Sequence, residues 1–321
     1  MRALIVGTRG SALALWQTDL AVSILREHAR RTDSRVEISV RTITTRGDTD
    51  QSPVLPGKLG KGFFTLELEA ALRAGEIDFA VHSLKDLPTE SPADLAIAAI
   101  LPRASKHDLL LARKDSVQEN STGQLPLAAA ATVGSSSLRR SALIRRYAPG
   151  ARSTPLRGNV PTRLKKLAQG EEYHAIVLAA AGVERLALDL APFAAFDLNP
   201  RIWVPAPGQG AVAIQCRADD AEVRALLGAV SHATTADDTA HERLYLQGLK
   251  GGCTTPFGCV VDGQDLCIGL DVNGRWRGAI VTRAGADRAK LLAALEAAEF
   301  RETTGAEWLY RKHRPAGVQV A

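Results

Sequence analysis

Short apolar runs alternate with amphipathic segments along most of the chain. The apolar or alternating runs predict strands at residues 3–7, 36–40, 79–81, 95–101, 109–111, 132–134, 152–157, 175–178 and 211–217. Apolar residues at helical spacing predict helices between them, at 12–24, 64–74, 138–147, 161–169 and 235–249. Strands that alternate with helices indicate an α/β fold with parallel or mixed sheets.

Two segments share the same local pattern: a strand, a small hydroxyl-rich turn that carries Arg, and the start of a helix. They span residues 6–13 and 133–143. The first turn of a helix presents unpaired backbone N–H groups and a partial positive charge, which favour a bound anion. Joints of this kind are common, so the pattern also fits two unrelated turns. The repeat predicts two similar lobes that face one anionic ligand across a cleft.

The region after residue 217 has a different pattern. The helix at 235–249 leads into Gly251-Gly252-Cys253. Further strands are expected near 259–261, 267–272 and 278–282, and further helices near 286–298 and 302–310. This order predicts a separate, small α+β domain.

Cys253 is the strongest candidate for chemistry among the four cysteines. Glycines and a proline surround it and exclude a regular element, so its thiol is expected on a loop that a reaction partner can approach. A buried structural cysteine is the alternative. Cys216 follows the parity of its apolar strand and is expected in the core, while Cys259 and Cys267 lie in strand-like runs. The spacing does not match a zinc site, so no metal is expected.

Charge is a weaker signal than pattern. The net charge is +5, and 30 of the 40 cationic residues are Arg. A codon bias explains this excess as well as the recognition of carboxylates does. A basic protein can also bind nucleic acid, but no helix has a pattern for reading bases and aromatic residues are scarce. The N-terminal apolar run is too short for a signal peptide and no run is long enough to span a membrane, so we expect a cytoplasmic protein with reduced cysteines.

The strand at 79–81 runs into a loop that ends at Pro88. Ligands of open α/β sheets gather at the carboxyl ends of strands, which places Lys85 and Asp86 near a ligand. A carboxylate there can hold a developing positive charge or transfer protons. The alternative is a surface ion pair between the two side chains. His82 is expected to be packed rather than catalytic.

Cations and hydroxyls in loops and at helix starts form a third group. Each alone is expected to be a solvated surface group, but together they fit a ligand with many carboxylates. The first lobe contributes Arg9, Ser11, Lys58, Lys61, Ser83 and Lys85, and the second contributes Ser135, Ser136, Ser137, Arg139, Arg140, Arg157 and Arg163.

Seven motifs follow one another along the chain, at residues 8–17, 45–48, 80–86, 133–140, 157–160, 208–211 and 251–253. In content, order and spacing they resemble the porphobilinogen deaminase family, over roughly residues 4–260. The resemblance implies a transferase of porphyrin and haem synthesis that joins four porphobilinogen molecules head to tail into hydroxymethylbilane and releases ammonia. It also implies two lobes like those of type II periplasmic binding proteins, with mixed sheets, and a small C-terminal α+β domain.

The same resemblance implies domain boundaries and residue roles. The first lobe would comprise residues 1–103 and 204–221, the second 104–203, and the C-terminal domain 222–321. Cys253 would hold one dipyrromethane cofactor through a thioether, and Asp86 would be the catalytic carboxylate. The cations and serines named above would pair the carboxylates of cofactor and substrate. Porphobilinogen is then the expected partner of a monomer that binds neither nucleic acid nor membranes.

Two other classes of protein fit part of the pattern. A non-catalytic binding module with the same two lobes would explain the Arg-rich loops, but it leaves the Gly-Gly-Cys loop without a role. A nucleic-acid-binding protein is suggested by the basic pI alone.

Overall fold

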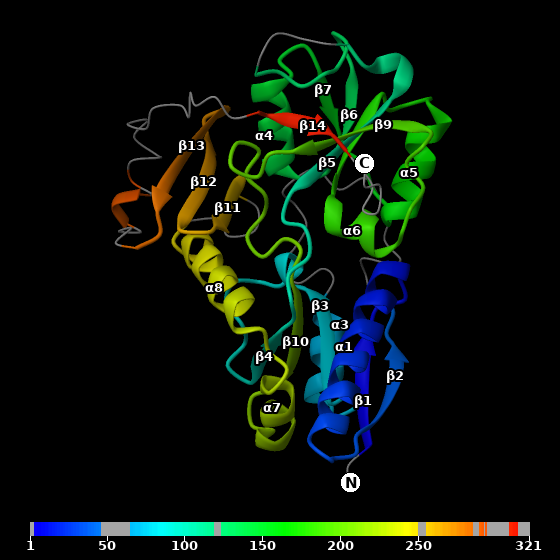
Figure 1. The fold of residues 1–321 in the computed structure, drawn as a ribbon, viewed down its shortest axis with the longest axis vertical. Coiled ribbons are helices and arrows are strands. Elements are labelled where there is room, and N and C mark those ends of the chain that lie inside the picture. Colours follow the sequence, from blue (N-terminus) through cyan, green and yellow to red (C-terminus); the bar gives the residue numbers. More distant parts are fainter. Residues whose placement is uncertain are drawn as a thin grey trace, which may run out of the picture. The chain divides into compact units, whose positions relative to one another are not determined.

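The computed structural model describes residues 3–45, 65–118, 123–249, 255–284, 289–291, 293 and 308–313. The chain divides into two compact units, Met1–Ser105 with Pro207–Thr254 and Lys106–Ala206 with Thr255–Ala321. Each unit contains its own mixed sheet (Figure 1).

The sheet of the first unit has the strand order β2-β1-β3-β10-β4. Its strands are β1 (Ala3–Thr8), β2 (Glu37–Thr42), β3 (Phe79–Ser83), β4 (Leu95–Ile100) and β10 (Val212–Arg217). The strands β2, β1 and β3 are parallel, whereas β10 is antiparallel to both of its neighbours.

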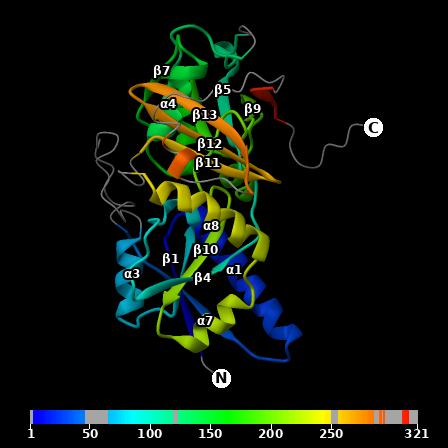
Figure 2. The same ribbon diagram turned by 90° about the vertical axis from the view of Figure 1, so that its left-hand side faces the viewer.

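Helices cover both faces of this sheet because side chains of a strand alternate between its faces. Phe79 and Val81 pack against α1 (Ala12–Arg31) and α7 (Ala221–Gly228), and Ala80 packs against α3 (Leu66–Arg73). Figure 2 shows α1 and α3 on opposite sides of the strands. A further helix, α8 (Ala233–Gln247), packs with Ala236 beside the residues that follow β3.

The second unit repeats this sheet. Its strands are β5 (Asp108–Arg113), β6 (Thr132–Gly134), β7 (Arg152–Thr154), β8 (Ala175–Ala179), β9 (Phe193–Leu198) and β14 (Tyr310–Lys312), in the order β14-β9-β5-β8-β6-β7. When this sheet is read from β7 to β9, its strand order and strand directions match those of the first sheet. Strand β5 is antiparallel to both of its neighbours, as β10 is in the first sheet. The helix α4 (Leu138–Tyr147) packs on one face, and α5 (Val160–Gln169) and α6 (Ala180–Arg185) pack on the other. The repeat confirms the predicted two-lobe α/β class.

The C-terminal region contributes to both units. The helices α7 and α8 belong to the first unit, whereas a three-stranded antiparallel sheet belongs to the second. Its strands are β11 (Phe257–Asp262), β12 (Asp265–Val272) and β13 (Arg275–Thr282). Val260, Cys267 and Trp276 of this sheet share a core with Leu143 of α4 and with Trp203. The three-domain boundaries expected from the sequence stay a prediction.

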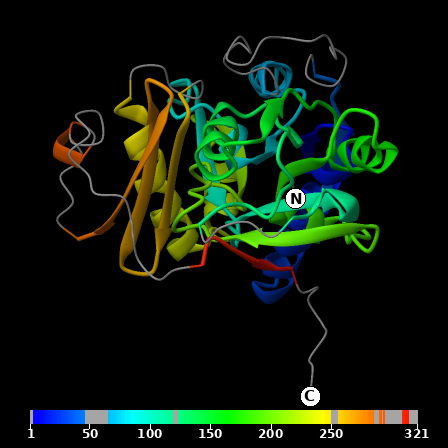
Figure 3. The same ribbon diagram turned by 90° about the horizontal axis from the view of Figure 1, so that it is seen from above.

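Most predicted elements form where the pattern places them, but α6, β9 and α7 were not predicted. Two of the predicted elements also differ in the structure. The strand expected over 152–157 ends at Thr154, since Pro155 has no N–H to continue the ladder. The helix expected over 302–310 is wrong at its end, because Tyr310 begins β14, which pairs with β9 (Figure 3). Asp197 on β9 accepts a hydrogen bond from His313 Nδ1 (2.7 Å) and helps to fix that strand.

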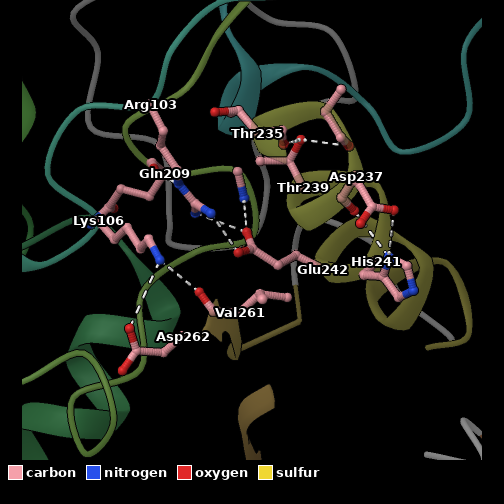
Figure 4. A network of polar contacts seen from close by, with 12 residues as sticks. Arg103, Lys106, Gln209, Thr235, Asp237, Thr239, His241, Glu242, Val261 and Asp262 are labelled. Atoms are coloured by element: carbon pink, nitrogen blue, oxygen red, sulfur yellow. Dashed lines mark hydrogen bonds and ion pairs between the residues drawn. The ribbon is translucent and has the colours of Figure 1, made fainter. Parts of the chain in front are cut away.

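The two segments that leave the first sheet, after β4 and before β10, touch through their backbones. Gly210 has a φ of +87°, and a Cβ there would lie 2.7 Å from the carbonyl oxygens of Ala104 and Ser105, so only glycine fits. Arg103 donates two hydrogen bonds to the Glu242 carboxylate of α8 (2.6 and 2.9 Å). Gly208 N donates to the same carboxylate (2.7 Å), as Figure 4 shows. The Arg103 side chain is 6% exposed and that of Glu242 is fully buried.

Replacing Glu242 with Gln tests this buried pair. Glu242→Gln leaves the Arg103 guanidinium buried without a counter-charge, so the free energy of unfolding should fall by about 3–5 kcal/mol in urea titrations. The control is Glu27→Gln, because Glu27 forms exposed pairs with Arg30 and Arg31 that contribute at most about 1 kcal/mol. Equal, small losses in the two variants would contradict a stabilising role for the pair.

Candidate active site

The loop after β3 turns Asp86 toward solvent. A short 3₁₀ turn (Leu84–Asp86) follows Ser83 directly. Leu84 N donates to Ala211 O (3.0 Å) and Leu87 N donates to Leu84 O (3.2 Å). The Leu84 and Leu87 side chains are buried, whereas Asp86 between them is exposed. Two apolar anchors therefore fix the turn and leave the carboxylate accessible.

The N-terminus of α1 begins next to this loop. Ser11 caps the helix, since its Oγ accepts from Ala14 N (3.3 Å). The first turn holds no acidic residue, so its partial positive charge is not offset within the helix. Arg9, half-buried, precedes the cap and adds a full positive charge. This end of the helix is therefore suited to an anionic group.

A pocket joins the helix start to the loop. Its cavity volume is about 80 Å³, and the pocket opens to solvent. The pocket brings together four residues predicted from the sequence, Arg9, Ser11, Ser83 and Asp86. Lys85 lies on the same loop but outside the lining. The other lining residues are Leu13, Ala14, Gln17, Thr65, Val81 and His82.

Sequence reasoning assigned no role to Gln17. Its Nε2 lies 2.9 Å from Ser83 Oγ, and its Oε1 lies 3.2 Å from the same hydroxyl. Gln17 is buried with Thr18 on a face of α1 whose other buried residues are apolar, and a long polar side chain on such a face is the signal that could have found it. The amide fixes Ser83 at the edge of the pocket.

His82 lines this pocket, and one of its buried ring nitrogens has no hydrogen-bond partner in the described structure. The side chain is 6% exposed, and its Nε2 has no hydrogen-bond partner among the described residues. Burial lowers the pKa of His82 to about 4, and the charge of Arg9 acts in the same direction, while the neighbouring Gln215 amide opposes them. The ring is therefore neutral near pH 7, packed as predicted. A buried nitrogen without a partner fits a pocket whose ligand carries polar groups.

The depressed pKa of His82 makes stability depend on pH. In the unfolded chain His82 is protonated below about pH 6.5, whereas in the folded protein it is protonated only below about pH 4. The contribution of His82 to the free energy of unfolding therefore has its full value above pH 6.5. As the pH falls to about 4, this contribution decreases by up to about 3 kcal/mol. Urea unfolding of wild type and His82→Gln at pH 7.5, 6, 5 and 4 measures it. A variant with the wild-type slope would show that His82 is not the group responsible.

The second unit has the matching joint at the start of α4. Ser137 caps the helix, with its Oγ accepting from Arg140 N (3.4 Å), and Ser135 Oγ accepts from Ser137 N (3.2 Å). Ser136 Oγ donates to Leu156 O (2.8 Å) and accepts from Leu156 N (3.1 Å). Arg157 and Arg163 are half-buried beside the start of α5, where Arg163 Nε donates to Gly158 O (2.7 Å).

Arg139 and Arg140 are buried, unlike the solvated side chains expected for each alone. Asp108, fully buried, accepts from Arg139 Nη2 (3.0 Å) and from two nitrogens of Arg140 (3.1 and 2.7 Å). Trp203 Nε1 also donates to this carboxylate (3.0 Å). Burial lowers the pKa of Arg139, and Asp108 opposes that shift. Two guanidinium groups share one carboxylate, which leaves a positive charge at this helix start.

Three predicted residues, Lys58, Lys61 and Cys253, lie outside the described residues. The other cysteines, Cys216, Cys259 and Cys267, are buried in strands as expected. Burial raises the pKa of the Cys216 thiol to about 11, so it is unreactive near neutral pH.

Fold and site together define a two-lobe α/β protein with a pocket where Arg9 and a capped helix start lie beside an exposed carboxylate. Residues 4–225 match the family model described as "Porphobilinogen deaminase, dipyromethane cofactor binding domain". The porphobilinogen deaminase of Shouchella clausii is 42% identical, over 80% of this chain and 79% of its own. That of Brevibacillus brevis is 44% identical, over 79% and 78%. The chain belongs to the porphobilinogen deaminase family.

Members of this family polymerise porphobilinogen in tetrapyrrole biosynthesis, and the matched domain binds their dipyrromethane cofactor. The predictions of family, transferase activity and cofactor are thereby confirmed. The matched range ends before Cys253, so the attachment site stays a prediction.

Among solved structures, the probable amino-acid ABC transporter extracellular-binding protein ytmK of Bacillus subtilis is similar at a TM-score of 0.41. It is 10% identical, over 78% of this chain and 98% of that chain. No helix within the described ranges is long and apolar enough to cross a membrane.

Proposed function

We propose that the pocket around Asp86 carries out the joining of four porphobilinogen molecules into hydroxymethylbilane, on a dipyrromethane that Cys253 holds. The observation that carries the proposal is the lining of one pocket by an exposed carboxylate, a half-buried Arg and a capped helix start. This combination provides contacts for the acids of the substrate and a negative group for the cation that the reaction generates.

The ring of porphobilinogen carries an acetate and a propionate, so a growing chain brings many carboxylates. In the first lobe, Arg9, Ser11, Ser83 and Lys85 bind them together with the N–H groups of α1. In the second lobe, the start of α4 offers the serines and the excess positive charge of the Asp108 cluster, supplemented by Arg157 and Arg163. Lys58 and Lys61 are proposed for the same role from the motif alone. The cofactor, when bound, supplies the terminal pyrrole to which the first porphobilinogen is joined.

Asp86 has two roles in this proposal: it stabilises the cation formed from the substrate, and it accepts the proton released when the new bond forms. The C–N bond of the substrate aminomethyl group breaks and ammonia leaves, so that positive charge spreads over the pyrrole ring. The Asp86 carboxylate stabilises this cation. A C–C bond then forms, and the proton displaced from the attacked pyrrole carbon passes to Asp86 and on to solvent.

Cys253 is proposed as the attachment site because the glycines before it in the sequence predict an accessible loop, whereas the described cysteines are buried. A thiolate is a strong nucleophile toward an electrophilic carbon and forms a stable thioether. Action as a monomer in the cytoplasm, without nucleic acid, is part of the same proposal.

Asp86→Asn tests the catalytic role. The amide keeps the shape but neither stabilises a cation nor accepts a proton, so release of ammonia and tetrapyrrole from porphobilinogen should slow by about 100- to 10,000-fold. Circular dichroism and intact mass should match those of the wild type. Turnover at the wild-type rate would remove Asp86 from the mechanism, and the absence of ammonia release by the wild type would favour a binding module.

Cys253→Ala tests the attachment site. Without the thiol no thioether forms, so the intact mass of the purified variant should lack the two pyrrole units expected on the wild type. Cys216→Ala is the control and should keep them, because Cys216 is buried in β10. An adduct on Cys253→Ala would refute the assignment.

A further inference from the structure

The helix α8 binds the loop that carries Asp86 through a guanidinium group. Arg243 Nη1 donates to Leu84 O (3.3 Å) and to Leu87 O (3.2 Å), and its Nη2 donates to Pro88 O (2.5 Å). One turn further along the helix, Gln247 Nε2 donates to Thr89 O (2.7 Å). These four carbonyls lie on both sides of Asp86, so α8 holds the backbone that enters and leaves this residue.

The chemistry of these contacts favours Arg over other donors. A guanidinium group has five N–H donors in a rigid plane and can serve several carbonyls at once, whereas the ammonium of Lys is a single point. Hydrogen bonds from a charged donor are stronger than those between neutral groups. The side chain is half-buried, so water competes for only part of it.

The helix α8 is itself held in place by Glu242, the residue before Arg243. Glu242 pairs with Arg103 and accepts from Gly208 N, in the contacts of Figure 4. Gly208 in turn lies against the loop, because a Cβ there would come within 2.9 Å of Leu84 Cγ. Glu242 therefore fixes α8, and the adjacent Arg243 fixes the loop that carries Asp86. Arg243 precedes Cys253 by ten positions in the sequence.

We propose that Arg243 is a positioning residue that sets the Asp86 carboxylate for the reaction. The proposal rests on the proposed function of Asp86. Displacing a catalytic group by about 1 Å can slow a reaction 100-fold, and the loop is short enough for its backbone contacts to decide where the carboxylate points. Arg243 itself donates to backbone carbonyls and is not among the residues that line the pocket.

The test compares Arg243→Ala and Arg243→Lys with the wild type, all checked by intact mass for the cofactor. We expect kcat to fall about tenfold in the Ala variant and less in the Lys variant, with KM within about twofold of wild type, since the carboxylate-binding groups are unchanged. Hydrogen exchange of peptides that cover residues 84–89 should be faster. Guanidinium at low millimolar concentration should restore part of the activity of Arg243→Ala, which a loss of folding would not allow.

Arg224→Ala is the matched control. Arg224 is exposed on α7 of the same unit and donates to a backbone carbonyl, that of Ala218 (2.9 Å). This variant should keep the wild-type kcat and the wild-type exchange of residues 84–89.

The outcomes separate this inference from the function on which it rests. Wild-type kcat in both Arg243 variants overturns the positioning role, as does a loss of kcat with unchanged exchange over 84–89 and no rescue. If the Ala variant does not fold, the Lys variant gives the same readouts. An inactive wild type overturns the proposed function instead, and the exchange of residues 84–89 still reports whether Arg243 holds the loop.

Discussion

Buried guanidinium groups that must be paired are the constraint on which both lobes depend. Removing an Arg from water is costly unless a carboxylate and hydrogen-bond acceptors replace its hydration. In the first unit Arg103 meets Glu242, and this pair joins the crossing segments to α8. In the second unit Asp108 meets Arg139 and Arg140 at the start of α4. Charge is thus fixed in place by the fold before any ligand arrives, which is the preorganisation that binding a polyanion requires.

The repeated sheet explains why each unit has a capped helix start of the same kind. In both sheets the first parallel strand leads through a hydroxyl-containing turn into a capped helix, α1 after β1 and α4 after β6. The loops beside these helix starts differ between the two units. In the first unit the loop after β3 adds a carboxylate to the cations, whereas in the second unit the described loops add arginines. The proposed function accordingly assigns the chemistry to the first unit and assigns to the second a contribution of positive charge.

The sequence predicted those features of the site that depend on local signals. The cap at Ser11, the strand that ends before Asp86 and the exposed turn stopped by Pro88 all follow from spacing and residue type. It did not predict that Asp108 pairs with Arg140, because the partners are 32 positions apart and Asp108 opens an apolar strand without any local mark of its role. The contact of Gln17 with Ser83 and those of Arg243 with the Asp86 loop were missed for the same reason, as they form only once the sheet places distant segments together. The helix predicted over 302–310 was wrong at Tyr310, because pairing with β9 overrides local preference and makes this residue the start of β14.

The most direct test of the account is the intact mass of the purified protein after mixing with porphobilinogen. The account predicts a series of species that carry between one and four added pyrrole rings, each addition accompanied by one molecule of released ammonia. A protein whose mass stays unchanged, in a solution that gains no ammonia, would contradict it.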